Sequence, residues 1–107
     1  MSASTETQYR LPEPIRKTND LYRLLAGNEL LGLAPGEIAK ALNVSPSWVS
    51  VTLPALAAQS GFVEQVEGTN RWRLSVAFVR ISMTVMTNLS KAKAHLEEVS
   101  HRYSVPI

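Results

Sequence analysis

The chain has 107 residues, 45% of them hydrophobic and 19% charged, and its formal net charge at pH 7 is only +2. This length suits one domain with a modest core, and the composition is that of a folded chain rather than a disordered one. The absence of cysteine excludes disulfides, cysteine-ligated zinc and thiol catalysis, and it favours an intracellular protein.

Residues 1–14 read as a flexible arm, because they are polar, contain two prolines and show no helical or strand period. The arm lacks the apolar core of a signal peptide. The most apolar run, 76–85, is interrupted by Arg80 and Ser82 and is too short for a membrane helix. We therefore expect a cytoplasmic protein with no membrane partner.

A first helix is predicted to begin near Thr18 or Asn19, since either side chain can cap free backbone N–H groups. Its apolar face carries Leu21, Leu24 and Leu25, and the pair Gly27-Asn28 is a stop signal. Residues 30–34 then form a short connection that can include one extended segment.

A second helix is predicted from Pro35, whose missing N–H is not needed in a first turn. Its apolar face is formed by Ile38, Ala39 and Leu42. Asn43 tolerates a left-handed conformation and is expected to end the helix.

A third helix is predicted to have Ser45 as its cap and Pro46 at its first position. Its core stripe is Val49, Leu53 and Leu56, and Gly61 closes it. Pro54 lies inside this helix, where it removes one hydrogen bond and is expected to cause a kink.

Two short extended runs, 62–66 and 71–74, flank Glu67-Gly68-Thr69-Asn70 and predict a β-hairpin. A turn centred on Gly68 and Thr69 places Gln65 opposite Trp72 and Glu64 opposite Arg73. One face of this hairpin is then apolar and can lie on the helices; it carries Val63, Trp72 and Leu74.

A last helix is predicted from a cap at Ser75 to about His101. A regular apolar stripe follows its whole length, with the spacing of a helix and a slight drift from a heptad. The stripe consists of Phe78, Ile81, Val85, Leu89, Ala92, Leu96 and Val99. A second stripe covers another face of the first half only, and it consists of Val76, Val79, Met83 and Met86. Because an exposed apolar helix would aggregate, we expect the long stripe to be the interface of a homodimer.

The runs GEIAKALNVSPSWVS (36–50) and GFVEQVEGTNRWRLS (61–75) together resemble the N-terminal winged helix of IclR-type bacterial transcriptional regulators. The shared features are a small-residue turn between two helices, a Ser-Pro helix start, a Gly-aromatic-Val exit and an Arg-aromatic-Arg-Leu strand. The MarR-type winged helix is similar in outline. The resemblance implies a mainly α fold with a β-hairpin wing, DNA binding as a dimer and control of transcription. It usually also implies a ligand-sensing C-terminal domain, which we do not expect within these 107 residues.

These expectations divide the chain into an arm (1–14), a winged helix-turn-helix domain (15–75), a dimerisation helix (76–101) and a tail (102–107). In a winged helix the third helix, here about 46–60, enters the major groove of double-stranded DNA. The wing, 62–74, touches the DNA backbone or minor groove, which places the protein at the nucleoid. The residues expected to contact DNA are Ser45, Ser47, Trp48, Ser50, Val51, Thr69, Asn70, Arg71, Arg73, Arg16, Lys17 and Lys40.

The charge pattern departs from that of a typical recognition helix, because residues 45–66 contain Glu64 but neither lysine nor arginine. Phosphate contacts are therefore expected mainly from Arg71, from Arg73 unless it pairs with Glu64, and from a basic arm. That arm carries Arg10, Arg16 and Lys17. Ser45 is either a cap only or a phosphate ligand as well.

A second hypothesis is a protein-binding winged-helix module, such as a phage or plasmid inhibitor of a host factor. It would use the uncharged third helix, with Trp48 either partly buried or anchoring the partner. No catalytic motif or cofactor site is evident. The spacing does not put both His95 and His101 together with a carboxylate on one helical face, so we expect no metal.

Overall fold

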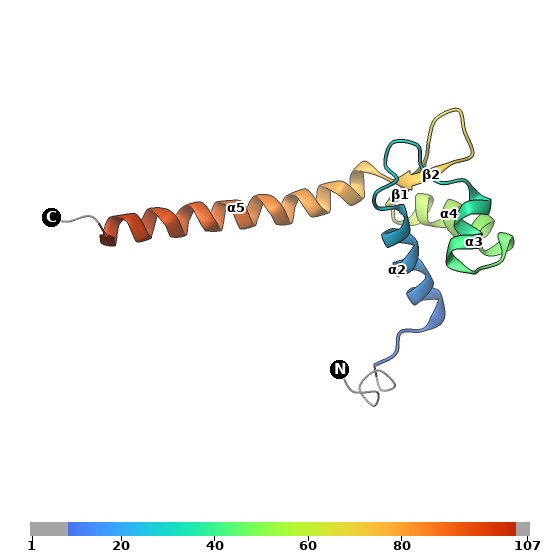
Figure 1. Cartoon of the computed structure of the whole chain (residues 1–107), viewed down its shortest axis with the longest axis horizontal. Helices are drawn as coiled ribbons and strands as arrows, with labels where there is room; N and C mark the ends of the chain where they lie inside the picture. Colours follow the sequence, from blue (N-terminus) through green and yellow to red (C-terminus); the bar gives the residue numbers. More distant parts are fainter. Residues whose placement is uncertain (1–8, 105–107) are drawn as a thin grey trace. The chain divides into compact units, whose positions relative to one another are not determined.

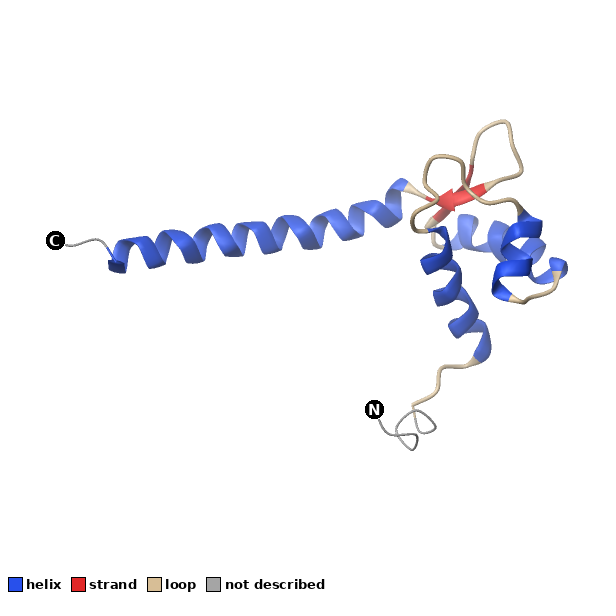
Figure 2. Cartoon of the chain, in the orientation of Figure 1, coloured by secondary structure: helices blue, strands red, loops and turns tan. Residues whose placement is uncertain are grey.

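The computed structural model describes residues 9–104, and it is mainly helical with a small antiparallel hairpin and a long C-terminal helix (Figures 1 and 2). The chain divides into two compact units, residues 1–75 and 76–107. Most of the arm expected over 1–14, and the end of the tail expected over 102–107, lie outside the described residues.

Helix α2 spans Glu13–Leu25, so it begins earlier than the predicted start at Thr18 or Asn19. Pro12 and Pro14 are tolerated at the start of α2 because the N–H groups of a first turn have no intrahelical partner. Pro12 is the N-cap residue, and its carbonyl accepts from the Arg16 N–H at 3.0 Å. The Thr18 hydroxyl donates to the Pro14 carbonyl instead of capping the helix. The helix ends before Gly27, whose φ of 95° only glycine adopts easily.

Helices α3 (Pro35–Leu42) and α4 (Pro46–Gln59) have the predicted boundaries and caps. Asn43 adopts the left-handed conformation after α3, with φ 54°. The Ser45 hydroxyl accepts the Trp48 N–H at 3.0 Å, so its capping role is confirmed. Pro54 lies on the exposed side of α4, which continues beyond it to Gln59.

The hydrophobic core of the first unit joins all three of these helices and the hairpin. Its fully buried side chains are Leu21 and Leu25 from α2, Ile38 from α3, and Val49 and Leu53 from α4. Burying each of them stabilises the fold by roughly 1.5–3 kcal/mol relative to exposure. Tyr22 of α2 adds an edge-to-face contact with Phe62, at 6.2 Å between ring centroids.

Strands β1 (Val63–Gln65) and β2 (Trp72–Leu74) pair antiparallel in the predicted register. Glu64 lies opposite Arg73 and Gln65 opposite Trp72, and the buried face carries Val63 and Trp72. The connection before α3 adds an antiparallel bridge, because Leu33 and Trp72 exchange two backbone hydrogen bonds of 2.8 Å. The extended segment expected in that connection is therefore present.

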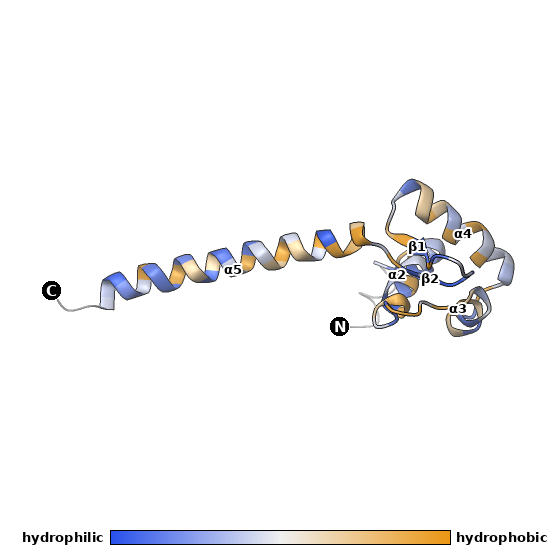
Figure 3. Cartoon of the chain, turned by 90° about the horizontal axis from the view of Figure 1, so that it is seen from above, coloured by the Kyte–Doolittle hydropathy of each residue, from blue (hydrophilic) through white to orange (hydrophobic). Residues whose placement is uncertain are grey.

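The second unit contains helix α5, Val76–Ser104, which runs three residues beyond the predicted end. Polar and apolar stretches alternate along its ribbon in Figure 3. None of its described residues is buried. Ser75, directly before it, is buried; its hydroxyl donates to the Gly61 carbonyl and its N–H to the Phe62 carbonyl.

Candidate nucleic-acid interface

The connection between α3 and α4 is short and is fixed by hydrogen bonds to the end of α3. The Val44 N–H donates to the Ala39 carbonyl at 3.0 Å, and the Asn43 N–H donates to the Lys40 carbonyl at 3.3 Å. The Lys17 ammonium of α2 donates to the Leu42 carbonyl at 2.9 Å. A cation at a helix C-terminus also complements the helix dipole. Lys17 therefore belongs to the packed domain, which corrects its assignment to a free basic arm.

Helix α4 turns one face to the core and leaves the other free. Val49 is 1% exposed and Leu53 is fully buried, whereas Val51 is 70% exposed. Ser47 and Ser50 are exposed as well, and the Ser50 hydroxyl donates to the Ser47 carbonyl at 3.1 Å. The free face offers hydroxyls and small apolar side chains, of which Val51 is the largest, but it carries no charge.

Trp48 is half-buried and packs against the core cluster. This agrees with partial burial, which was one of the two alternatives predicted for this side chain. Its backbone N–H is held by the Ser45 cap. The indole is thereby fixed at the edge of the exposed face of α4, where part of it remains open to a ligand.

The Arg71 guanidinium, which the sequence analysis expected to contact phosphate, is partly exposed and is bound by groups of the domain itself. Its Nε donates to the Leu31 carbonyl at 2.9 Å, and its Nη2 donates to the Gly32 carbonyl at 3.0 Å. The same Nη2 lies 3.1 Å from Oε1 of Glu37. Arg71 thus fixes the connection between α2 and α3 to the hairpin.

The structural role of Glu37 was not predicted from the sequence, although its position three residues after Ala34 is that of a capping-box glutamate. Its Oε1 accepts the Ala34 N–H at 2.9 Å, the reciprocal half of a capping box. The side-chain half is impossible with alanine at the N-cap. The glutamate at the third position of α3 was the available clue.

Arg73 pairs with Glu64 across the hairpin, with 3.6 Å between Nε and Oε1. This was one of the two alternatives for Arg73. Because the pair is partly exposed, it contributes at most about 1 kcal/mol and is readily broken by a competing anion.

The turn of the hairpin holds the remaining wing residues at the surface. The Thr69 hydroxyl donates to the Val66 carbonyl at 2.8 Å and accepts the Arg71 N–H at 3.0 Å. Asn70 is exposed beside it. The Asn70 amide suits a phosphate contact, whereas the Thr69 hydroxyl already donates its proton within the turn, and Glu67 in the same turn opposes an anion.

Among the other predicted contacts, Lys40 is exposed on α3 and Arg10 is exposed before α2. Arg16 lies within α2 and is half-buried, and its Nε is buried without a hydrogen-bond partner in the described chain. Arg10 and Lys40 are thus the most accessible of the predicted basic contacts.

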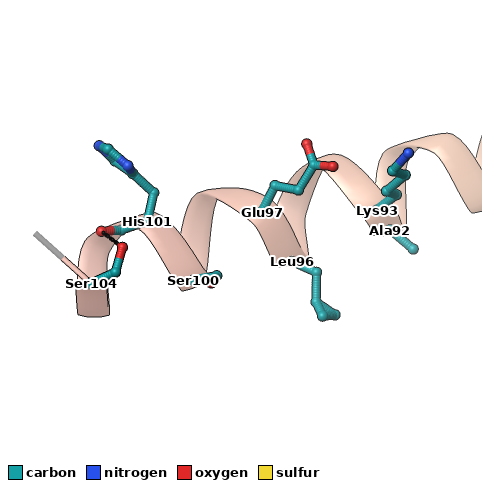
Figure 4. A pocket seen from close by; sticks show the side chains of 7 residues that line it. All are labelled: Ala92, Lys93, Leu96, Glu97, Ser100, His101 and Ser104. Carbon is teal, nitrogen blue, oxygen red and sulfur yellow. Dashed lines mark hydrogen bonds between the residues drawn. The ribbon is translucent and has the colours of Figure 1, made fainter.

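The predicted dimer stripe lies on α5, where Ile81, Val85, Leu89 and Leu96 are each more than half exposed. Near the helix end, Figure 4 shows Leu96 projecting to the opposite side from Glu97 and His101. The hollow around these side chains is lined by α5 residues. A single helix supplies one wall only, so this surface is open rather than an enclosed ligand pocket.

Comparisons of the chain with models of known families, with curated proteins and with solved structures find no match, so the resemblance to IclR-type regulators stays a prediction. Within residues 9–104, no helix is both long and apolar enough to cross a membrane. Over the same residues, no cluster of three or more histidine or acidic side chains is placed to hold a metal ion.

Proposed function

We propose that the chain is a DNA-binding transcriptional regulator of the winged helix-turn-helix type that acts as a homodimer in the cytoplasm. Helices α3 and α4, their tight connection and the following hairpin correspond in order to such a domain. The observation that carries the proposal is the way in which α4 is held in the domain. Its cap and buried face are fixed by the domain, while the N-terminal half of its other face is free.

In this proposal the first half of α4 lies in the major groove, where recognition helices present their N-terminal residues. Ser47 and Ser50 supply donors and acceptors for base edges or phosphate. Val51 is placed to contact a thymine methyl group. The free N–H groups at the start of α4 favour an anion, although Ser45 already occupies one of them.

Phosphate contacts are assigned to the most accessible polar groups around α4. These are Lys40 near the end of α3 and Asn70 in the hairpin turn, and the Thr69 hydroxyl joins them if a phosphate replaces the Val66 carbonyl as its acceptor. Arg73 joins them if the phosphate displaces Glu64, whereas Arg71 acts by holding the hairpin in place. With so few cations, affinity depends on two copies binding together.

A protein-binding module is the second candidate, and the charge distribution favours it. Helix α4 has no charged residue, and Arg71 and Arg73 both have acidic partners within the domain. A surface of Trp48, Val51 and serines resembles the low-charge core of a protein interface. The partner would be another protein in place of DNA.

The two candidates are separated by selecting genomic DNA fragments with the purified protein at physiological salt. A regulator enriches a palindromic sequence, and its affinity falls as salt rises because phosphate contacts release counterions. Ser50→Glu places a negative charge on the free face of α4 and is expected to weaken binding at least tenfold. Gln59→Glu adds the same charge at the exposed far end of α4 and serves as the matched control.

Equal loss of DNA affinity in both variants would exclude the proposed orientation of α4. Failure to enrich any duplex, together with recovery of a stoichiometric protein partner that is lost on Trp48→Ala, would establish the second candidate instead. Circular dichroism of each variant verifies that the helices are intact.

A further inference from the structure

We infer that two copies of α5 pair as a parallel, in-register coiled coil, so that both N-terminal units lie at the same end of the pair. The inference rests on the proposed homodimer and adds the direction and register of its helices. It starts from the apolar stripe of α5, defined above, which Tyr103 extends by one further step. Leu96 is 65% exposed and Tyr103 87% exposed, so this seam is open to a partner over its C-terminal half.

The spacing of the seam determines its type. From Val85 to Tyr103 the apolar positions alternate in steps of four and three residues, which is the heptad pattern of a coiled coil. Between Phe78 and Leu89 the steps are three, four and four, which is an eleven-residue repeat. Such a repeat locally relaxes the left-handed supercoil. The heptad part, 85–103, is therefore the segment expected to pair most tightly.

Charges beside the seam then select the direction. The antiparallel register that overlaps the whole heptad part places Ala92 opposite Leu96 and Leu89 opposite Val99. In that register Lys93 flanks Lys93 of the second copy, and His95 flanks its own equivalent. The like charges of the two lysines at flanking positions disfavour this pairing. Shifting the antiparallel copies by one heptad places Val99 opposite Ser82 and loses an apolar layer.

The parallel arrangement has none of these costs. Each seam residue meets the same residue of the second copy, while Lys93 flanks Asn88 and His95 flanks Ser100. Arg102 already pairs with Glu98 of its own helix at 2.8 Å. Figure 4 shows Lys93 and Glu97 on the side of the helix away from Leu96, where they remain in solvent.

The direction matters because Val76 directly follows Ser75, so each N-terminal unit is attached to the start of its α5. At roughly 1.5 Å per residue, this 29-residue helix is about 43 Å long. Antiparallel helices would attach the two units at opposite ends of that length. Parallel helices attach them at one end, as binding to half-sites about 34 Å apart on one duplex requires.

The chain lacks cysteine, so single cysteine variants report the pairing without background. Ala92→Cys lies in the seam and is expected to form a disulfide-linked dimer in high yield under mild oxidation, because parallel copies bring the two positions together. Ala94→Cys lies on the opposite helical face and is the matched control, for which no comparable yield is expected. Sedimentation of the reduced proteins gives the oligomeric state.

Preferential crosslinking between Ala92→Cys and Leu96→Cys copies in a mixture would instead demonstrate the antiparallel register and overturn the inference. A monomer at tens of micromolar would overturn it together with the homodimer of the proposed function. A parallel dimer that binds no DNA would leave the inference standing and refute the proposed function. Each crosslink is measured without DNA, so these failures are distinguishable.

Discussion

Nη2 of Arg71 lies 3.1 Å from Oε1 of Glu37, which joins the hairpin to the first turn of α3. The same carboxylate oxygen accepts the Ala34 N–H, and the same guanidinium binds two carbonyls of the connection before α3. One arginine therefore organises a polar junction between the hairpin and the helices. Its charge is partly neutralised by Glu37 within the domain.

Arg71→Ala is expected to lower the free energy of unfolding by about 1–2 kcal/mol, because two backbone carbonyls lose a charged donor in a partly exposed site. Urea denaturation measures the change. Arg73→Ala, which removes only the hairpin ion pair, is the matched control and is expected to cost less than about 1 kcal/mol. Equal effects of the two substitutions would contradict the structural role of Arg71.

Gly32→Ala is expected to be among the most damaging single-methyl substitutions. A Cβ atom there would lie 2.6 Å from the Trp72 carbonyl oxygen, and Gly32 has φ 68°. Strain and the clash with backbone together are expected to cost roughly 2–5 kcal/mol, measured by urea denaturation.

Gly27→Ala provides the control for the conformational part of this effect. Gly27 also has positive φ, but a Cβ there would meet no atom within 4 Å. Its cost is expected to be limited to the strain of a left-handed alanine, about 1–2 kcal/mol. If both variants lost the same stability, the close approach of Gly32 to Trp72 would not be a determinant of the fold.

Ser45→Ala is expected to destabilise the domain by about 1 kcal/mol, since the Trp48 N–H loses its side-chain acceptor. Ser45→Asp retains an acceptor and is expected to preserve stability. Ser47→Ala, on the exposed turn beside it, is expected to change stability by less than about 0.5 kcal/mol. Thermal unfolding of the three variants tests this order. A larger loss of stability in Ser47→Ala than in Ser45→Ala would show that Ser45 is not the capping residue.

Glu29 is expected to titrate at lower pH than an ordinary glutamate. The Gly27 N–H donates to its Oε1 at 2.6 Å, and this bond, with one from its own backbone, lowers the pKa of the Glu29 carboxyl. Since the folded-state pKa is below the unfolded value, the stabilisation is present above the unfolded pKa. It is lost as the pH falls through the folded pKa.

NMR titration of the Glu29 side-chain carboxyl measures this pKa directly. Glu29→Gln is expected to remove the corresponding acid-dependent loss of stability, whereas Glu13→Gln in the first turn of α2 controls for a general loss of negative charge. A midpoint for Glu29 at or above the usual glutamate range would disprove the proposed hydrogen bond.

The sequence alone determined the elements whose signals are local. Pro35, Asn43 and Ser45 marked helix ends correctly, because capping and left-handed backbone preferences act within a few residues. The hairpin register followed from the turn around Gly68, since side chains alternate along a strand. The start of α2 was misplaced because Pro12 and Pro14 suit a first turn as well as an irregular arm.

Only the tertiary structure decided what the basic side chains do. Arg71 is adjacent in sequence to the hairpin turn, but its partners are the carbonyls of Leu31 and Gly32, brought close by the bridge between Leu33 and Trp72. Lys17 likewise meets the end of α3 only after α2 and α3 pack. Long-range packing sets such distances, and no periodicity or spacing within one segment encodes them.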